Sequence, residues 1–294
     1  MSHKRRTAAQ APEATRINGR AARSVSLLDR GLHYGDGLFE TIACIAGRAR
    51  FLDRHLKRLA DGCARLAMPP LDAAGLRREV EKLAAGAARS VIKLLVTRGA
   101  AVSRGYGLTG REQPTRVALR YRWPADDPAL ARDGVRVRIA SLQLGENPAL
   151  AGIKHCNRLE QVLARAEWTD TGITESLLFS SSGALISGTM TNVFLVHDSR
   201  LLTPRVDRCG VAGVMRAVVL DLAARAGIAA EECVLEAHHL AQAHEVFLTS
   251  ALKGIRPVRE LDGRVLAPGP VTRALQAHLA PLLAGEARPR RIPR

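Results

Sequence analysis

Aromatic residues are scarce in this chain: Phe, Trp and Tyr together make up 3% of its 294 residues. We therefore predict a core built mainly from Ala, Leu and Val. The hydrophobic content of 47% is nevertheless typical of a globular protein and excludes wholesale disorder. The chain is too long for one small core, so two modest domains in one compact subunit are expected.

Cysteines and long apolar runs are also limited. The five cysteines are odd in number and scattered, and no two are spaced as Cys-x-x-Cys. This excludes a disulfide framework and a cysteine-based zinc site, and no metal is predicted. No segment has the length of a membrane span, and the basic residues 1–6 precede no apolar stretch of a secretory signal. We expect a cytoplasmic protein with no membrane partner.

Acidic residues are outnumbered, 28 against 44 Lys and Arg, which leaves a net charge of +16. A basic chain can bind nucleic acid, and this is the alternative from another functional class. However, residues 1–16 and 285–294 each carry four basic residues against one acidic residue. The remaining arginines are dispersed, without a basic stripe interleaved with aromatics. We therefore predict no specific nucleic-acid partner.

The spacing of apolar residues predicts a mixed fold, α+β or α/β, in two domains. Residues 1–16 are expected to be disordered, 17–123 to form an N-terminal α/β domain, 124–134 a polar linker, 135–284 a C-terminal domain and 285–294 a basic tail. Asn18-Gly19 predicts a hairpin turn. Expected strands are 38–45, 91–97, 116–121, 135–141, 176–179, 193–197 and 245–250, and expected helices are 52–66, 76–88, 158–169 and 211–226.

Lys154 is the first candidate for chemistry. It precedes the expected helix 158–169, for which Asn157 is a suitable N-cap and Glu160 completes a capping-box pattern. A lysine just ahead of a helix N-terminus lies in a positive potential, which lowers the pKa of its ammonium group. A free amine at neutral pH is what a lysine needs to form a Schiff base. A second candidate feature is the glycine-bearing turn 209–213, because the helix after it offers free amides to an anion.

Several segments carry a resemblance to a known family. Residues 152–161 and Ser103-Arg-Gly-Tyr106 resemble the aminodeoxychorismate lyases, which belong to the fold-type-IV group of pyridoxal 5'-phosphate (PLP) enzymes. The segments 33–41 and 55–59 resemble motifs shared more widely in that group. The resemblance covers about residues 17–260. It implies a two-domain subunit with a small N-terminal α/β domain and a larger C-terminal pseudo-barrel domain that binds PLP. It also implies a homodimer.

The resemblance implies a role for each matching residue. Lys154 would bind PLP through a Schiff base and act as the catalytic base. The other implied cofactor-binding residues are Arg58, Asn192, Val214, Met215, Ser250 and Ala251, with Ser187 in the position next to the pyridine ring. The implied substrate-binding residues are His33, Arg104 and Tyr106. The implied reaction converts the small molecule 4-amino-4-deoxychorismate to 4-aminobenzoate and pyruvate, a step of folate biosynthesis.

Ser187 departs from the pattern of the group. Most fold-type-IV enzymes have a glutamate there, five residues before the asparagine that is Asn192 here, and its carboxylate keeps the pyridine nitrogen protonated. A serine hydroxyl cannot do this as a carboxylate does. The change disfavours the alternative enzyme, a D-amino-acid or branched-chain aminotransferase. It affects a lyase less, because formation of an aromatic product supplies driving force.

Overall fold

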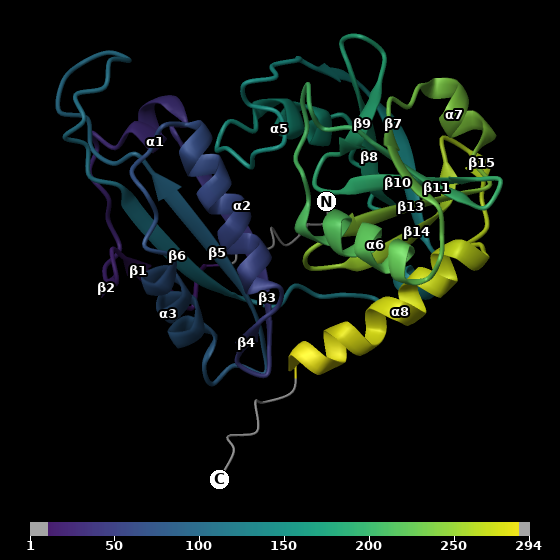
Figure 1. Cartoon of the computed structure of the whole chain (residues 1–294), viewed down its shortest axis with the longest axis horizontal. Helices are drawn as coiled ribbons and strands as arrows, with labels where there is room; N and C mark the ends of the chain where they lie inside the picture. Colours follow the sequence, from purple (N-terminus) through teal and green to yellow (C-terminus); the bar gives the residue numbers. More distant parts are fainter. Residues whose placement is uncertain (1–10, 288–294) are drawn as a thin grey trace, which may run out of the picture.

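The computed structural model describes residues 11–287 and shows two domains lying side by side (Figure 1). The N-terminal domain is an antiparallel six-stranded sheet in the order β2-β1-β6-β5-β3-β4. Its elements are β1 (Ala14–Ile17), β2 (Arg20–Ala21), α1 (Arg30–Tyr34), β3 (Gly37–Ile45), β4 (Arg48–Ala49), α2 (Leu52–Arg65), α3 (Ala73–Ala84), β5 (Arg89–Thr97) and β6 (Thr115–Arg122).

The helices α2 and α3 cover one face of this sheet. Leu56 and Leu59 of α2 and Leu76 of α3 pack against Ile42 of β3 and Ile92 of β5 in one buried cluster. Side chains alternate between the two faces of a strand, so Glu40 of β3 also points toward the helices. This places an acidic side chain within a mainly apolar layer.

Strand β1 corrects one prediction. It begins at Ala14, inside the segment 1–16 predicted to be disordered, because residues 14–17 pair along their whole length with β6. The predicted turn at Asn18 and Gly19 is confirmed, since both have positive φ and connect β1 to β2. Residues 1–10 of the predicted disordered segment, and 288–294 of the predicted tail, lie outside the described residues.

The C-terminal domain is a nine-stranded sheet in the order β12-β11-β10-β13-β14-β7-β8-β9, with β15 beside β14. Leu185, the first residue of β9, forms a backbone bridge with Leu235, which follows β12. The two ends of the sheet therefore approach each other. The predicted mixed fold and pseudo-barrel are thereby confirmed. The elements are α4 (Ala129–Arg132), β7 (Val135–Leu144), α5 (Leu159–Ala166), β8 (Ile173–Ser180), β9 (Leu185–Gly188), β10 (Asn192–His197), β11 (Arg200–Pro204), α6 (Val214–Arg225), β12 (Ala230–Cys233), α7 (Ala237–Gln242), β13 (Glu245–Ser250), β14 (Gly254–Leu261), β15 (Arg264–Val265) and α8 (Pro270–Ala287).

Helices α6 and α8 pack together on one face of this sheet. Phe194 of β10 and Phe247 of β13 stack with ring centroids 4.9 Å apart, in a cluster that includes Met215 of α6 and Leu275 of α8. Helix α8 was not predicted, and it extends over residues 285–287 of the expected tail. No helix within residues 11–287 is both long enough and apolar enough to cross a membrane.

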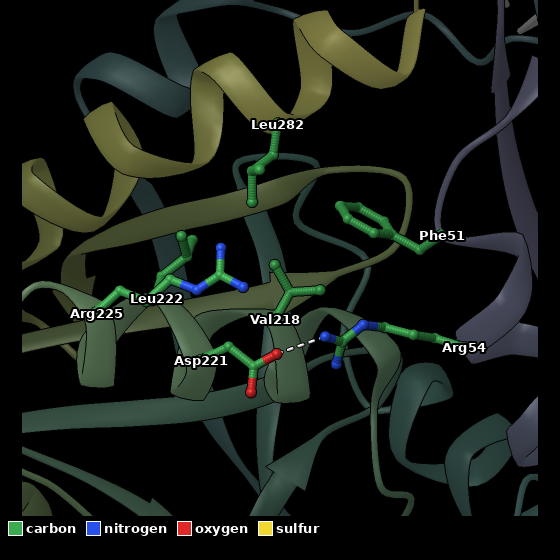
Figure 2. A pocket seen from close by; sticks show the side chains of 7 residues that line it. All are labelled: Phe51, Arg54, Val218, Asp221, Leu222, Arg225 and Leu282. Carbon is green, nitrogen blue, oxygen red and sulfur yellow. Dashed lines mark hydrogen bonds and ion pairs between the residues drawn. The ribbon is translucent and has the colours of Figure 1, made fainter.

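The two domains also meet where α2 begins. A cavity of about 190 Å³ lies there between α2, α6 and α8. Figure 2 shows Phe51 and Arg54 of the N-terminal domain facing Val218 and Asp221 of α6, with an ion pair between Arg54 and Asp221. None of the predicted site residues lines this cavity, so we assign it to the joint between the domains.

Candidate active site

The segment that carries Lys154 lies along the edge of β3. The amide of Phe39 donates to the carbonyl of Lys154 at 3.0 Å, and the amide of Cys156 donates to the carbonyl of Gly37 at 2.9 Å. A backbone bridge between Leu38 and His155 lies between these bonds. A loop of the C-terminal domain therefore acts as a short additional strand on the N-terminal sheet. This places Lys154 between the two domains.

The predicted helix cap after Lys154 is wrong. Helix α5 begins at Leu159 with Arg158 as its N-cap, and no side chain of the described residues caps it. The Nδ2 of Asn157 instead points toward the carbonyl of Gly35, at 3.4 Å. Gly35 has a φ of 64°, and a Cβ there would lie 2.3 Å from the Asn157 Oδ1, so this close contact requires glycine. Glu160 accepts from the amide of Gly145 at 2.7 Å, not from the cap.

The amine of Lys154 nevertheless has the predicted property. Its Nζ lies 4.4 Å from the ring centroid of Phe39. Burial, together with the positive charges of Arg58 and, to a smaller extent, Arg158 and Lys93, lowers the pKa of Lys154 to about 8, against the opposing charge of Glu40. The direction of the shift is confirmed, but its cause is desolvation and neighbouring cations, not a capped helix.

The turn before α6 lies directly beside the lysine loop. The amide of Gly152 donates to the carbonyl of Gly210 at 3.0 Å, and the amide of Ala212 donates back to the carbonyl of Gly152 at 2.9 Å. Helix α6 begins at Val214, three residues later than predicted, with Gly213 as its N-cap. No side chain of the described residues caps it, so the amides of Val214 and Met215 at its start are suited to bind an anion.

Asn192 connects this turn to the central strands. Its Nδ2 donates to the carbonyl of Val211 at 2.9 Å, and its backbone pairs with Thr249 in the β10–β13 ladder. The Oγ1 of Thr249 is buried and has no hydrogen-bond partner among residues 11–287. Ser250 and Ala251 follow at the end of β13, where Ser250 Oγ accepts from the amide of Lys253 at 3.2 Å. Asn192 therefore joins the turn before α6 to the end of β13, the two segments that carry the predicted cofactor-binding residues Val214, Met215, Ser250 and Ala251.

Arg58 reaches this turn from the N-terminal domain. Its Nη1 donates to the carbonyl of Ala212 at 2.9 Å, and its Nε donates to Oε1 of Glu40 at 2.8 Å. Burial alone would raise the pKa of Glu40, but hydrogen bonds from His55 and Arg58 and the charge of Arg58 outweigh it and hold that pKa at about 2. Glu40 was not among the predicted site residues. Its position three residues after Gly37, on the helix-facing side of β3, was the available signal.

Ser187 is buried on β9, opposite Leu178 of β8. The acid that faces the turn after β9 is Glu175, which is also buried. Its carboxylate accepts hydrogen bonds from Ser176 and from the backbone or hydroxyl groups of Thr189, Met190 and Thr191. Glu175 therefore holds the turn between β9 and β10, and its acceptor positions are occupied.

The three predicted substrate residues lie on α1 and on the β5–β6 loop of the N-terminal domain. His33 is exposed, with its Nε2 2.6 Å from the carbonyl of Leu27. Arg104 and Tyr106 lie on the loop between β5 and β6, and Tyr106 is 82% exposed. The buried Arg30 fixes this loop by donating to the carbonyls of Gly105, at 3.2 Å, and Tyr106, at 3.1 Å. No hydrogen bond or ion pair among residues 11–287 joins them to Lys154.

The assembled groups fit an aldehyde cofactor that carries a phosphate. A lysine with a lowered pKa, the cation of Arg58, the start of α6 and the unpartnered Thr249 Oγ1 are joined by the contacts described above. The amine suits an aldehyde, and the cation and amides suit a dianion. A buried hydroxyl without a protein partner can donate a hydrogen bond to a ligand oxygen. These residues therefore meet the requirements of PLP.

Comparison with known proteins agrees with this geometry. The model of the family described as Amino-transferase class IV matches residues 37–261. The chain is 32% identical to the aminodeoxychorismate lyase of Vibrio harveyi over 267 residues, covering 90% of this chain and 98% of that protein.

Two solved structures share the whole fold. The 4-amino-4-deoxychorismate lyase of Pseudomonas aeruginosa superposes with a TM-score of 0.88 at 45% identity, covering 91% of this chain and 98% of that one. The branched-chain amino acid aminotransferase of Escherichia coli superposes with a TM-score of 0.83 at 25% identity, covering 95% and 97%. The family is thus shared by lyases and aminotransferases.

Proposed function

The chain belongs to the class-IV aminotransferase family, and from that premise we propose that it is a PLP-dependent lyase that converts 4-amino-4-deoxychorismate to 4-aminobenzoate and pyruvate. Its place would be in folate biosynthesis. The single observation that carries the proposal is the Lys154 amine, whose pKa of about 8 leaves it partly unprotonated near neutral pH, beside two segments suited to a phosphate.

The chain's own residues divide the work of binding and proton transfer. Arg58, the amides of Val214 and Met215, and the Ser250–Ala251 turn would hold the phosphate of PLP. When bound, PLP supplies an electron sink for charge at the amine-bearing carbon of the substrate. Lys154 removes the proton from that carbon and donates a proton as enolpyruvate leaves. The ring product becomes aromatic, and the enolpyruvate becomes pyruvate.

The test is a direct assay of both products. Purified protein supplied with PLP and 4-amino-4-deoxychorismate is expected to release 4-aminobenzoate and pyruvate in equal amounts. The alternative is a branched-chain or D-amino-acid aminotransferase, which the structural similarity to the branched-chain enzyme favours. A protein that transfers amino groups to 2-oxo acids faster than it makes 4-aminobenzoate would overturn the lyase in favour of that alternative.

Ser187 offers a test that separates the two reactions. The replacement Ser187→Glu is expected to leave 4-aminobenzoate formation within about tenfold of the parent, a barrier change of roughly 1.4 kcal/mol, because aromatisation supplies the driving force. The same replacement should raise transamination of D-alanine, since a carboxylate there can keep a pyridine nitrogen protonated. Steady-state rates of both reactions give the answer. A fall in both would show that a glutamate only crowds the buried position on β9.

We further propose that the active protein is a homodimer in which the β5–β6 loop of each subunit reaches the site of the other. The loop carries Arg104 and Tyr106, which suit a carboxylate-bearing substrate and make no hydrogen bond or ion pair with Lys154 among residues 11–287. The amide of Ala101 in this loop donates to the carbonyl of Leu28, so the loop lies beside residues 25–32. Together they expose apolar side chains as a patch. Its members are Val25, Leu27, Leu28, Leu32, Val102, Tyr106 and Leu108.

Mixed dimers test this arrangement. A heterodimer of a Lys154→Ala subunit and an Arg104→Ala subunit, isolated with two tags, should keep one complete site and about half of the parental turnover per dimer. Each homodimeric variant alone should be nearly inactive. If the heterodimer shows no recovery, or the protein is a monomer by light scattering, the loop serves its own subunit and the proposed sharing is wrong.

A further inference from the structure

Glu40 has no role in the proposed reaction, yet it is one of the most buried charged groups in the described chain. It is 1% exposed, as is the neighbouring His55. An ionised carboxylate in an apolar layer is costly unless several donors satisfy it. Glu40 meets three: Nδ1 of His55 at 2.6 Å, and the Nε and Nη2 of Arg58. These three donors satisfy the buried carboxylate of Glu40.

The cluster determines where the Arg58 guanidinium points. A guanidinium carries five N–H groups in one rigid plane. Two bind the carboxylate of Glu40 from the side, and one binds the carbonyl of Ala212, the residue before the N-cap of α6. Contacts on two sides fix the plane. The two remaining N–H groups are therefore held beside the turn that opens α6.

His55 fixes the other half of the cluster. It lies one helical turn before Arg58 on α2, so both side chains lie on the same side of the helix. Because the pKa of Glu40 is held at about 2, its carboxylate is ionised and can only accept, and the His55 Nδ1 must donate. That bond constrains the carboxylate, which in turn constrains the arginine.

We propose that Glu40, braced by His55, is the positioning residue for the phosphate of the cofactor: it acts through Arg58 and does not touch the cofactor itself. This inference rests on the proposed PLP function and adds the residues that orient its cation. A lone arginine would sample many rotamers and would have to be ordered at each binding event. The buried carboxylate orders it in advance, which strengthens binding without a new contact to the ligand.

The proposal makes a prediction that depends on the phosphate. The replacement Glu40→Gln puts an amide N–H₂ against donors of His55 or Arg58, so the guanidinium loses its fixed plane. Affinity for PLP is expected to fall about 10- to 100-fold, the range for a hydrogen bond to a charged group. Affinity for pyridoxal, which lacks the phosphate, should change by no more than about twofold, since it never engages Arg58.

Equilibrium dialysis of the apoprotein with each compound measures both affinities without any enzyme assay. The charge of Glu40 opposes the lowering of the Lys154 pKa, so we choose roughly pH 9, where that amine is mostly unprotonated in parent and variant alike. The control is Glu79→Gln on α3, which removes another buried acid that pairs with Arg116 at 3.3 Å. It should leave both affinities unchanged.

A second variant keeps the test decisive if Glu40→Gln does not fold. Arg58→Lys retains the charge but lacks the fork, so one ammonium cannot bind both Glu40 and an anion. It should lose PLP affinity almost as fully as Arg58→Ala, and adding Glu40→Gln to Arg58→Ala should cost no further PLP affinity. Equal losses for PLP and pyridoxal, or full PLP affinity in Arg58→Lys, would overturn the positioning role while leaving the proposed function standing. A parent protein that binds no PLP would overturn both.

Discussion

Replacement of Lys154 by alanine is expected to lower the rate of 4-aminobenzoate formation by roughly three orders of magnitude or more, because one amine serves as both nucleophile and base. The neighbouring Arg58 and Arg158 cannot replace this amine, because guanidinium groups do not deprotonate in proteins. Turnover is measured by product release, with folding checked by circular dichroism. The protein should stay folded, since alanine removes a charged group from a partly buried position.

A chemical label provides an independent check. Borohydride reduction of the PLP-loaded parent should attach the cofactor to Lys154, as located by peptide mapping. The matched control is Lys57→Ala, because Lys57 is an exposed lysine of α2 that pairs with Asp61, at 2.7 Å. That variant should keep parental turnover and labelling. A label on another lysine would refute the assignment of Lys154.

The pH dependence of labelling follows from the same amine. Only the unprotonated amine reacts with an electrophile, so its rate rises with pH and levels off above its pKa. Lys154 should reach half of its maximal rate near its pKa of about 8, against 10.5 for an ordinary lysine. Competitive labelling of the apoprotein over about pH 6 to 11 resolves the two values. A midpoint near 10.5 would mean that the amine is solvated.

Replacement of Arg58 by alanine is expected to have the second large effect. Loss of its hydrogen bonds to the phosphate should weaken PLP retention by about 1.5–3 kcal/mol. The apoprotein should also lose stability, because Glu40 would keep its buried charge without its main partner. Breaking a buried pair costs about 3–5 kcal/mol, and the lower end is expected since His55 still donates. Dialysis measures cofactor retention and urea unfolding measures the stability of the apoprotein.

Arg54 is the matched control for Arg58. It lies one turn earlier on α2, and its ion pair with Asp221 is between side chains that are 43% and 47% exposed. Exposed pairs contribute about 0–1 kcal/mol, so Arg54→Ala should leave stability and cofactor retention nearly unchanged. If Arg58→Ala behaves like Arg54→Ala, Arg58 is a surface residue. It then contributes nothing to phosphate binding, and its pairing with Glu40 contributes nothing to the stability of the apoprotein.

Local patterns predicted seven of the fifteen strands within residues 11–287, and they missed the last helix. The predicted strand 245–250 coincides with β13, and the predicted strands 38–45 and 91–97 lie within β3 and β5. All three strands are buried on both faces over much of their length, which suits their apolar sequences. Helix α8 was missed. It contains Pro281, which removes an amide donor from the helix interior, and packing of Leu275 and Leu279 against α6 offsets that loss.

The helix cap at Asn157 shows how tertiary contacts override a local pattern. The residues fit a capping box, but the backbone of 154–156 pairs with β3, and that pairing takes Asn157 to Gly35. The pKa shift of Lys154 was predicted from the cap and is produced by burial. A correct expectation thus rested on the wrong local structure, because burial depends on residues distant in the chain.

The sequence by itself determined the mixed fold, the family resemblance and the identity of the candidate lysine, because apolar spacing and short motifs are local properties. Only the tertiary structure decided which groups surround that lysine. Lys154 and Arg58 come from different domains, and the contacts that join them run through Gly152 and Ala212. The role of Glu40 depends on the packing of β3 against α2. That packing buries its carboxylate, which is then stabilised by donors from His55 and Arg58.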